Sequence, residues 1–151
     1  MDKTLLDEKD IFIDKQFENT DSYFQFVCQN LEQESKIDSK YLESIKEREK
    51  NFPTGLKTGN ICVAIPHTDY QHSKTTQLVV TTLKTPLKFH QMDDPNSYCD
   101  VNIIIQILFD TPEKQLSLLK NLMKLIQNQD FLQNIKNAKD KKQIINIFVG
   151  G

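Results

Sequence analysis

The sequence has no apolar run near the roughly 20 residues that a membrane-spanning helix requires. Residues 1–6 and the acidic positions after them also lack the apolar core of a signal peptide. There is no stripe of basic residues either, because 19 lysines and arginines are spread among 21 aspartates and glutamates, giving a net charge of −2. Nucleic-acid binding therefore has no electrostatic basis. These absences predict a cytoplasmic protein with no nucleic-acid partner.

Cysteine is scarce, and the three cysteines form an odd, widely spaced set at Cys28, Cys62 and Cys99. Each lies within an apolar pattern, which favours buried free thiols in a reducing compartment over a disulfide framework. No internal repeat or low-complexity segment divides the 151 residues, of which 38% are hydrophobic. This size predicts a single domain over residues 1–151 with one sizeable core.

The most informative stretch is residues 59–69, Gly-Asn-Ile-Cys-Val-Ala-Ile-Pro-His-Thr-Asp. Residues 61–65 are apolar and β-branched at alternate positions, which predicts a buried strand. Pro66 ends this strand, because proline has no N–H to donate and its φ is fixed. His67 and Thr68 follow at the rigid end of the strand. A neutral imidazole held there can act as a base, a nucleophile or a ligand.

The segments before this stretch predict one strand and two helices. Residues 10–13 form a short apolar run, and residues 20–22 offer N-cap candidates for a helix that continues to Leu31. A second helix is expected to begin after Ser39, with charged residues in its last turns. We expect a loop between Gly55 and Gly59 to deliver the chain to the central strand.

The segments after it predict further strands. Residues 77–83 are rich in valine and threonine, and Pro86 is expected to break this strand before a short edge strand at residues 87–89. Residues 91–97 are polar and predict a surface loop. Residues 101–109 are the most apolar β-branched run and predict a central strand that is buried on both faces.

The hydrophobic period changes at Thr111, where Thr111 as N-cap, Pro112 and Glu113 predict the start of a helix. Its inward face is expected to contain the apolar residues Leu116, Leu119, Leu122, Met123 and Ile126. Short helices, each opening with an acidic cap, are expected at residues 130–137 and 140–148. The predicted fold class is α/β, with a mixed sheet of about five strands sandwiched by amphipathic helices.

The chain resembles enzyme IIA of the phosphoenolpyruvate-dependent sugar phosphotransferase system, of the fructose/mannitol class (type 2) and its galactitol-type branch. The resemblance covers nearly the whole chain. It rests on five segments: Arg-Glu-Lys-Asn-Phe-Pro-Thr-Gly-Leu at residues 48–56, Val-Ala-Ile-Pro-His-Thr-Asp at 63–69, Pro-Leu-Lys-Phe-His-Gln-Met at 86–92, Pro-Glu-Lys-Gln-Leu at 112–116, and the closing helices around residues 137–139 and 144–145.

This resemblance implies a phosphoryl relay. The phosphocarrier protein HPr would donate a phosphoryl group to Nε2 of His67, and His67 would pass it to a cysteine of enzyme IIB. The membrane component, enzyme IIC, would then transport and phosphorylate the sugar or alditol, for which the galactitol-type branch suggests galactitol. The family needs no organic cofactor and no metal. Its partner surface would lie on the apolar rim around His67, formed by the turn at residues 70–71 and the helix after Pro112. Contacts of this kind are small and weak, because a relay must release its partners.

Elementary chemistry assigns matching roles to the residues near His67. A nitrogen nucleophile must be neutral and have a free nitrogen, and phosphoryl transfer needs positioning and charge neutralisation. Arg48 is the candidate for charge stabilisation, because a guanidinium contacts two phosphate oxygens at once. Thr68 can supply a hydroxyl and a backbone N–H. Members of the class often have a second histidine where this sequence has Gln115, which can donate a hydrogen bond but cannot titrate.

Several alternatives stay open at this stage. His67 could be a structural residue that ends a strand. A zinc site is not expected, because the spacing of Cys62, His67 and His72 fits no common zinc motif and a fourth ligand is missing; His72 and His90 are expected to be solvated loop residues. The same fold and histidine also serve regulatory proteins, in which phosphorylation of His67 would control binding to a partner regulator. A degenerate interaction module is a further alternative. We expect a monomer. The sequence does not identify the sugar or alditol that the system transports.

Overall fold

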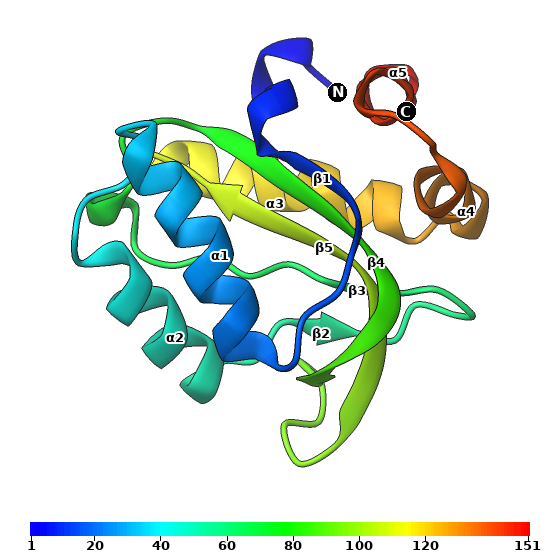
Figure 1. Ribbon diagram of the computed structural model, residues 1–151, viewed down its shortest axis with the longest axis horizontal. Coiled ribbons are helices and arrows are strands. Elements are labelled where there is room, and N and C mark those ends of the chain that lie inside the picture. Colours follow the sequence, from blue (N-terminus) through cyan, green and yellow to red (C-terminus); the bar gives the residue numbers. More distant parts are fainter.

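The computed structural model describes residues 1–151 and contains a mixed five-stranded sheet with the strand order β1-β4-β5-β3-β2 (Figure 1). The strands are β1 (Ile11–Lys15), β2 (Gly55–Leu56), β3 (Cys62–Ala64), β4 (Gln77–His90) and β5 (Tyr98–Leu108). β1 pairs with β4 and β3 pairs with β5 in parallel, whereas the β4–β5 and β2–β3 pairs are antiparallel. The predicted mixed sheet is confirmed.

Five α-helices cover the two faces of this sheet. They are α1 (Thr20–Gln33), α2 (Tyr41–Asn51), α3 (Pro112–Ile126), α4 (Gln129–Asn137) and α5 (Lys141–Gly150). Three short 3-10 helices are found at η1 (Lys3–Leu5), η2 (Glu8–Asp10) and η3 (Tyr70–His72). None of these helices combines the length and the hydrophobicity needed to traverse a bilayer.

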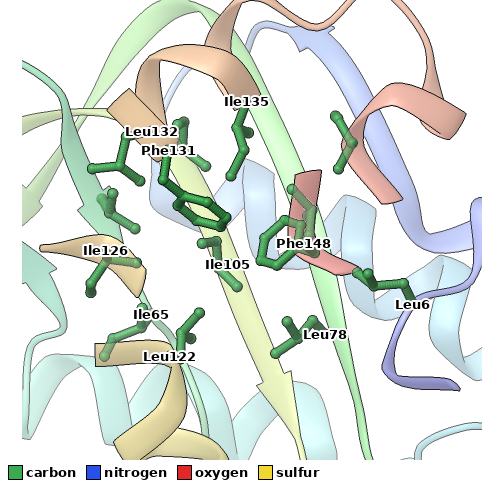
Figure 2. Packing of buried hydrophobic residues seen from close by; sticks show 14 of the residues in the cluster. Leu6, Ile65, Leu78, Ile105, Leu122, Ile126, Phe131, Leu132, Ile135 and Phe148 are labelled. Carbon is green, nitrogen blue, oxygen red and sulfur yellow. The ribbon is translucent and has the colours of Figure 1, made fainter. Parts of the chain in front are cut away.

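The structure has two apolar cores, one on each face of the sheet, and not the single core that was expected. Successive strand residues point to opposite faces, so Ile103, Ile105 and Ile107 of β5 pack in the core that includes α3, α4 and α5, which Figure 2 shows from close by. Ile104 and Leu108 pack in the other core, with α1 and α2. From Ile103 to Leu108 both faces of β5 are therefore buried, as its strongly apolar, β-branched sequence predicted. Cys28, Cys62 and Cys99 are buried free thiols, which confirms the prediction.

Two strand predictions were wrong. Pro86 does not break β4, which continues from Gln77 to His90 with an irregular register between Thr82 and Leu87; a proline is tolerated at such an irregularity. Gly55 does not begin a loop but pairs with Ala64 in the short strand β2. A Cβ atom at Gly55 would lie 2.6 Å from the carbonyl oxygen of His90, so a side chain there would collide with the backbone.

Two helix caps also differ from the prediction. Asn19, and not one of residues 20–22, caps α1 by accepting a hydrogen bond from the N–H of Ser22. Asn128, which is not acidic, caps α4. The predicted caps of α3 and α5, Thr111 and Asp140, are confirmed. Asparagine matches aspartate as an N-cap because both offer a carbonyl-type oxygen at the same reach.

The prediction for the inward face of α3 was wrong in its first turns, where it included Leu116 and omitted Leu118. Leu116 is 75% exposed, whereas Leu118 is 5% exposed and packs in the core with Leu122 and Ile126. These three lie at successive intervals of four residues on one helix face. Leu119 and Met123 are partly buried beside them. The leucine-rich sequence supports either phase, and contact with the sheet selects the second.

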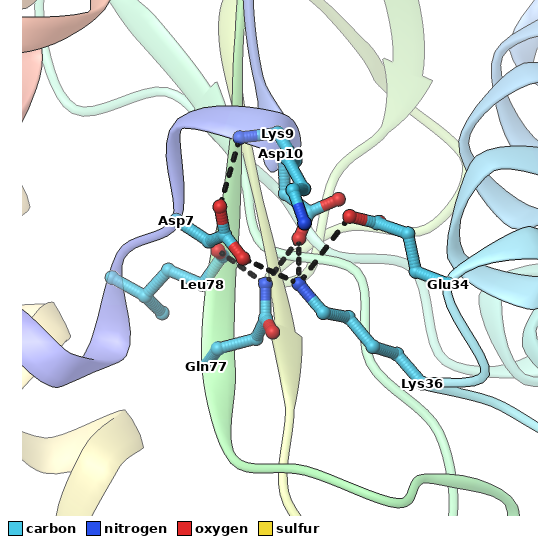
Figure 3. Close-up of polar contacts among 7 residues, drawn as sticks. All are labelled: Asp7, Lys9, Asp10, Glu34, Lys36, Gln77 and Leu78. Carbon is cyan, nitrogen blue, oxygen red and sulfur yellow. Dashed lines mark hydrogen bonds and ion pairs between the residues drawn. The ribbon is translucent and has the colours of Figure 1, made fainter.

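A buried polar cluster fastens the N-terminal segment to the rest of the fold (Figure 3). Nζ of Lys36 donates hydrogen bonds to Asp10 and, at 2.9 Å, to Asp7, and lies 3.6 Å from a carboxylate oxygen of Glu34. Asp10 is completely buried and also accepts a hydrogen bond of 2.8 Å from Nε2 of Gln77 in β4. Burial, followed by the neighbouring Asp10 carboxylate, raises the pKa of Glu34 to about 7. One lysine thus holds three acidic side chains together.

The two leucines of α3 provide a direct test of its phase. We expect Leu122→Ala to lower the free energy of unfolding by about 2–5 kcal/mol, because it leaves a cavity in a closed core. Leu116→Ala, the matched control, should change it by no more than about 0.5 kcal/mol because that side chain is exposed. Urea unfolding of both variants measures the difference, and equal losses would contradict the observed phase.

Glu34 should make stability fall as the pH rises. Its pKa of about 7 in the folded state lies above the unfolded value, so between the two the folded state holds a proton that the unfolded state has released. The free energy of unfolding should therefore decrease from about pH 4.5 to pH 7. Glu34→Gln should remove about 1–3 kcal/mol of this decrease. Unfolding at pH 5 and pH 8 tests it, with the exposed Glu32→Gln as the control.

Candidate functional site

His67 lies on a rigid turn directly after β3. The preceding Pro66 is buried, and its carbonyl oxygen accepts a hydrogen bond of 3.0 Å from the N–H of Ile107 in β5. Nδ1 of His67 lies 2.8 Å from the carbonyl oxygen of Ile65. Since a carbonyl oxygen can only accept, Nδ1 carries the ring proton and donates it. Nε2 is left unprotonated and has no hydrogen-bond partner within the chain.

The surroundings of His67 keep its ring neutral. Burial lowers the pKa of His67 below its ordinary value, and the positive charge of Arg48 lowers it further, against the opposing effect of the hydrogen bond to Ile65. The ring of Phe109 packs beside it, with 6.2 Å between the ring centroids. A neutral imidazole with Nδ1 blocked and Nε2 free is a nucleophile at one defined atom.

A hollow of about 260 Å³ lies in front of His67. Its lining includes all four site residues expected from the sequence, and it is formed by Arg48, His67, Thr68, Asp69, Tyr70, Pro112 and Gln115. Three chain segments therefore meet here: α2, the turn after β3, and the first turn of α3. The structure brings together residues that are far apart in the sequence.

Arg48 is the only arginine in the chain and makes no ion pair. It lies exposed near the end of α2, with its guanidinium carbon 4.6 Å from the centroid of the Phe52 ring. Cation–π contact with this ring holds the side chain without neutralising its charge. The guanidinium is therefore available to an anion that enters the hollow.

Of the two Thr68 donors expected from the sequence, the hydroxyl and the backbone N–H, only the N–H is without a partner in the structure. Its side chain is 6% exposed, and its hydroxyl is hydrogen-bonded to the hydroxyl of Ser44 in α2. The backbone N–H of Thr68 has no acceptor within the chain. The amide is thus the free donor, while the hydroxyl joins the turn to α2. Sequence analysis missed Ser44, although its position four residues before Arg48 places both on one helix face.

The N-terminus of α3 supplies the far wall of the hollow through Pro112 and Gln115. The first amides of a helix are unpaired and carry partial positive charge, which favours an anion. In α3, however, Pro112 has no N–H and the N–H of Lys114 is capped by Thr111, so this helix end contributes mainly the positive end of its dipole. The side chain of Gln115 is half-buried and makes no hydrogen bond within the chain, so its NH₂ group is free to donate.

The other histidines lie outside this hollow. His72 is in η3, half-buried, with Nδ1 3.0 Å from a carboxylate oxygen of Asp38, so it is not the solvated loop residue that was expected. His90 is exposed as expected but is the last residue of β4. Cys62, His67 and His72 do not form a ligand cluster: the one grouping of three such side chains is Asp7, Asp10 and Glu34, where the Lys36 ammonium already provides the cation.

Titration of the His67 ring tests this electrostatic description. We expect its pKa to lie below the ordinary value of about 6.5, chiefly because of burial. Replacing Arg48 with glutamine should raise the pKa part of the way, since one of its two depressing causes is removed. NMR of the imidazole nitrogens measures both values. A wild-type pKa above the ordinary value would contradict the description.

Comparison with known proteins gives consistent results. The model of a family described as "phosphoenolpyruvate-dependent sugar phosphotransferase system, EIIA 2" matches residues 4–150. The galactitol-specific EIIA component of Escherichia coli K12 is 29% identical over 93 residues, which is 62% of this chain and 61% of that relative. The match thus spans less than two thirds of that relative. Multiphosphoryl transfer protein 1 of the same strain is 25% identical over 149 residues, which is 96% of this chain and 17% of that protein.

Solved structures share the fold at lower identity. Enzyme IIA Mtl of Escherichia coli, solved in complex with phosphorylated enzyme IIB Mtl, superimposes with a TM-score of 0.78 at 15% identity and covers 97% of this chain and 98% of that chain. The nitrogen regulatory protein IIA-Ntr of Neisseria meningitidis gives a TM-score of 0.79 at 21% identity, with 96% and 97% covered. The predicted α/β fold is therefore confirmed.

Proposed function

Because the chain belongs to the EIIA 2 family of the phosphoenolpyruvate-dependent sugar phosphotransferase system, we propose that it carries phosphoryl groups on Nε2 of His67. Phosphorylated HPr is the proposed donor, and a cysteine of an enzyme IIB is the proposed acceptor. The observation that carries the proposal is the fixed tautomer: Nδ1 is occupied by the carbonyl of Ile65, and Nε2 is free in a hollow beside an unpaired arginine.

The transfer balances without an external base. The lone pair of Nε2 forms the new N–P bond while the donor nitrogen of HPr keeps the electron pair of the bond that breaks. No proton has to leave Nε2, since the ring proton is on Nδ1. In the second step a thiolate of enzyme IIB attacks phosphorus, and the electron pair of the N–P bond returns to Nε2. No metal or cofactor is needed for either step.

The hollow suits the charge that develops on the equatorial oxygens of the phosphoryl group. Arg48 provides a cation that can contact two oxygens, the N–H of Thr68 provides a fixed donor, and the positive end of the α3 dipole lies at the same hollow. Gln115 adds a neutral donor in place of a second histidine. These groups act by position and electrostatics, which is most of what phosphoryl transfer requires of a protein.

The proposed docking surface surrounds this hollow. Phe52 is 61% exposed beside Arg48, and Leu116 is 75% exposed next to Gln115. Two bare apolar side chains that flank a charged hollow suit a small contact that forms and dissociates quickly. The proposed cellular setting is cytoplasmic, as a monomer, with the sugar phosphorylated by a membrane enzyme IIC. The galactitol-specific relative makes an alditol such as galactitol the first candidate substrate of the system.

A phosphorylation assay tests the first step. With phosphoenolpyruvate, enzyme I and HPr, we expect the intact mass of the chain to rise by one acid-labile phosphoryl group. His67→Ala should remain unlabelled, whereas His90→Gln, the control at an exposed histidine, should be labelled like the wild type. Arg48→Gln should slow labelling about 100-fold, since an anion-stabilising group is lost. An unlabelled wild type with active partners would refute the phosphocarrier function.

Addition of an enzyme IIB distinguishes transport from regulation. The regulatory alternative rests on Gln115, which leaves the hollow without a second histidine. In a transport relay, the label should leave His67 and appear on the cysteine of a galactitol-type enzyme IIB. If His67 retains it in the presence of such enzyme IIB proteins, the regulatory function is favoured.

A further inference from the structure

Glu49 and Arg48 are neighbours at the end of α2, but their side chains point in different directions. Arg48 is exposed at the hollow, whereas Glu49 is half-buried and binds Thr54 with both carboxylate oxygens. Oε2 accepts the backbone N–H of Thr54 at 2.7 Å, and Oε1 accepts its hydroxyl at 2.7 Å. Thr54 is itself 3% exposed. This bidentate contact fixes the backbone of Thr54 relative to α2.

Thr54 continues the connection to His67. Its carbonyl oxygen accepts a hydrogen bond of 3.2 Å from the N–H of Ile65, and the carbonyl oxygen of Ile65 accepts the Nδ1 proton of His67 at 2.8 Å. Four residues, Glu49, Thr54, Ile65 and His67, are thus joined in series. The carboxylate of Glu49 therefore holds, through Thr54, the Ile65 carbonyl that orients the imidazole of His67.

The end of α2 does not require this carboxylate. The helix is closed by a backbone hydrogen bond of 2.7 Å from the N–H of Phe52 to the carbonyl of Arg48, and Glu49 bonds no helical amide. Burial also raises the pKa of Glu49 to about 7, so the fold keeps a carboxylate where its charge is disfavoured. Because burial of the Glu49 carboxylate lowers the stability of the fold, its presence here indicates a role other than stabilising α2.

We propose that Glu49 is a positioning residue for His67, which acts through Thr54 and Ile65 to keep the Nδ1 proton on the carbonyl of Ile65 and Nε2 free. Its effect on phosphoryl transfer rests on the function proposed above, but its effect on the imidazole does not. The contact between Glu49 and Thr54 also ties the end of α2, which carries Arg48, to the turn that carries His67. The distance between the guanidinium and the imidazole is thereby maintained.

The decisive measurement is the tautomer of His67, read from the imidazole nitrogens by NMR at pH 8. We expect the wild type to be protonated on Nδ1. Glu49→Gln should show a mixture of both tautomers, because a neutral amide oxygen holds the Thr54 N–H less strongly than a carboxylate and the Thr54 hydroxyl would have to turn and accept from the NH₂ group. Glu43→Gln, which removes the same charge from an exposed position of α2, should retain the wild-type tautomer.

Transfer rates supply the second readout. With HPr as donor, Glu49→Gln should be phosphorylated about tenfold more slowly, since small errors in the position of a nucleophile lower the rate steeply. Thr54→Ser keeps both donors and should react like the wild type. Thr54→Val loses the hydroxyl donor and should fall between the two. This pair decides the matter if Glu49→Gln does not fold.

The outcomes separate the two proposals. A folded Glu49→Gln variant with the wild-type tautomer and rate would overturn the positioning role, as would equal behaviour of Thr54→Ser and Thr54→Val if the Glu49 variant is unfolded. A wild type that HPr does not phosphorylate would overturn the proposed function. In that case the tautomer measurement still decides the role of Glu49.

Discussion

The hydrogen bond from Nδ1 of His67 to the carbonyl of Ile65 is the contact on which the candidate site depends. A neutral imidazole can carry its proton on either ring nitrogen, and this hydrogen bond keeps the proton on Nδ1 and leaves Nε2 free. The bond needs a carbonyl that cannot move, and the structure provides one: Ile65 is bound through its N–H to Thr54, and Pro66 is bound through its carbonyl to Ile107. Hydrogen bonds to the residue just before β2 and to β5 therefore hold the turn on either side.

The two-layer architecture explains why the site forms where it does. α2 packs in the core on one face of the sheet, and α3 packs in the core on the other. β3 lies between β2 and β5, so its end emerges between these two layers. Arg48 can reach the hollow from one layer and Gln115 from the other only because both cores are filled. The packing of the two cores therefore also determines the geometry of the site. If the helices on either face moved away from the sheet, Arg48 or Gln115 would move away from the imidazole of His67.

The parts predicted well from the sequence have strong local signals. Residues 61–69 combine an apolar run, a proline and a histidine, and Thr111 with Pro112 marks a helix start by cap chemistry alone. The errors occur where distant contacts decide. The phase of α3 depends on the sheet, which selects Leu118 over Leu116. β2 forms by pairing with β3, and Gly55 permits the close approach of this strand to His90.

The non-local contacts of the site were beyond sequence reasoning for the same reason. Nothing in the spacing of Ser44 and Thr68 says that their hydroxyls meet, since they lie 24 residues apart on different elements. Glu49 and Thr54 are only five residues apart, yet the bend after α2 is what turns Thr54 back toward the carboxylate. A sequence pattern identifies residues with suitable chemistry, but the tertiary fold determines which of their atoms are already occupied.

The pairing of charged side chains in the fold determines which charges remain free at the site. Lys36 and Lys114 make the ion pairs of the fold, and the sole arginine is left without an acidic partner. In the unphosphorylated protein the hollow is lined by this guanidinium, the carboxylate of Asp69 and a neutral His67 ring, so the charges of its lining roughly balance. A phosphoryl group on Nε2 would add close to two negative charges and make the hollow strongly negative. In the proposed relay, a partner that reads the charge around His67 would therefore meet two different surfaces, although the backbone, fixed through Thr54, Ile65 and Pro66, need not move.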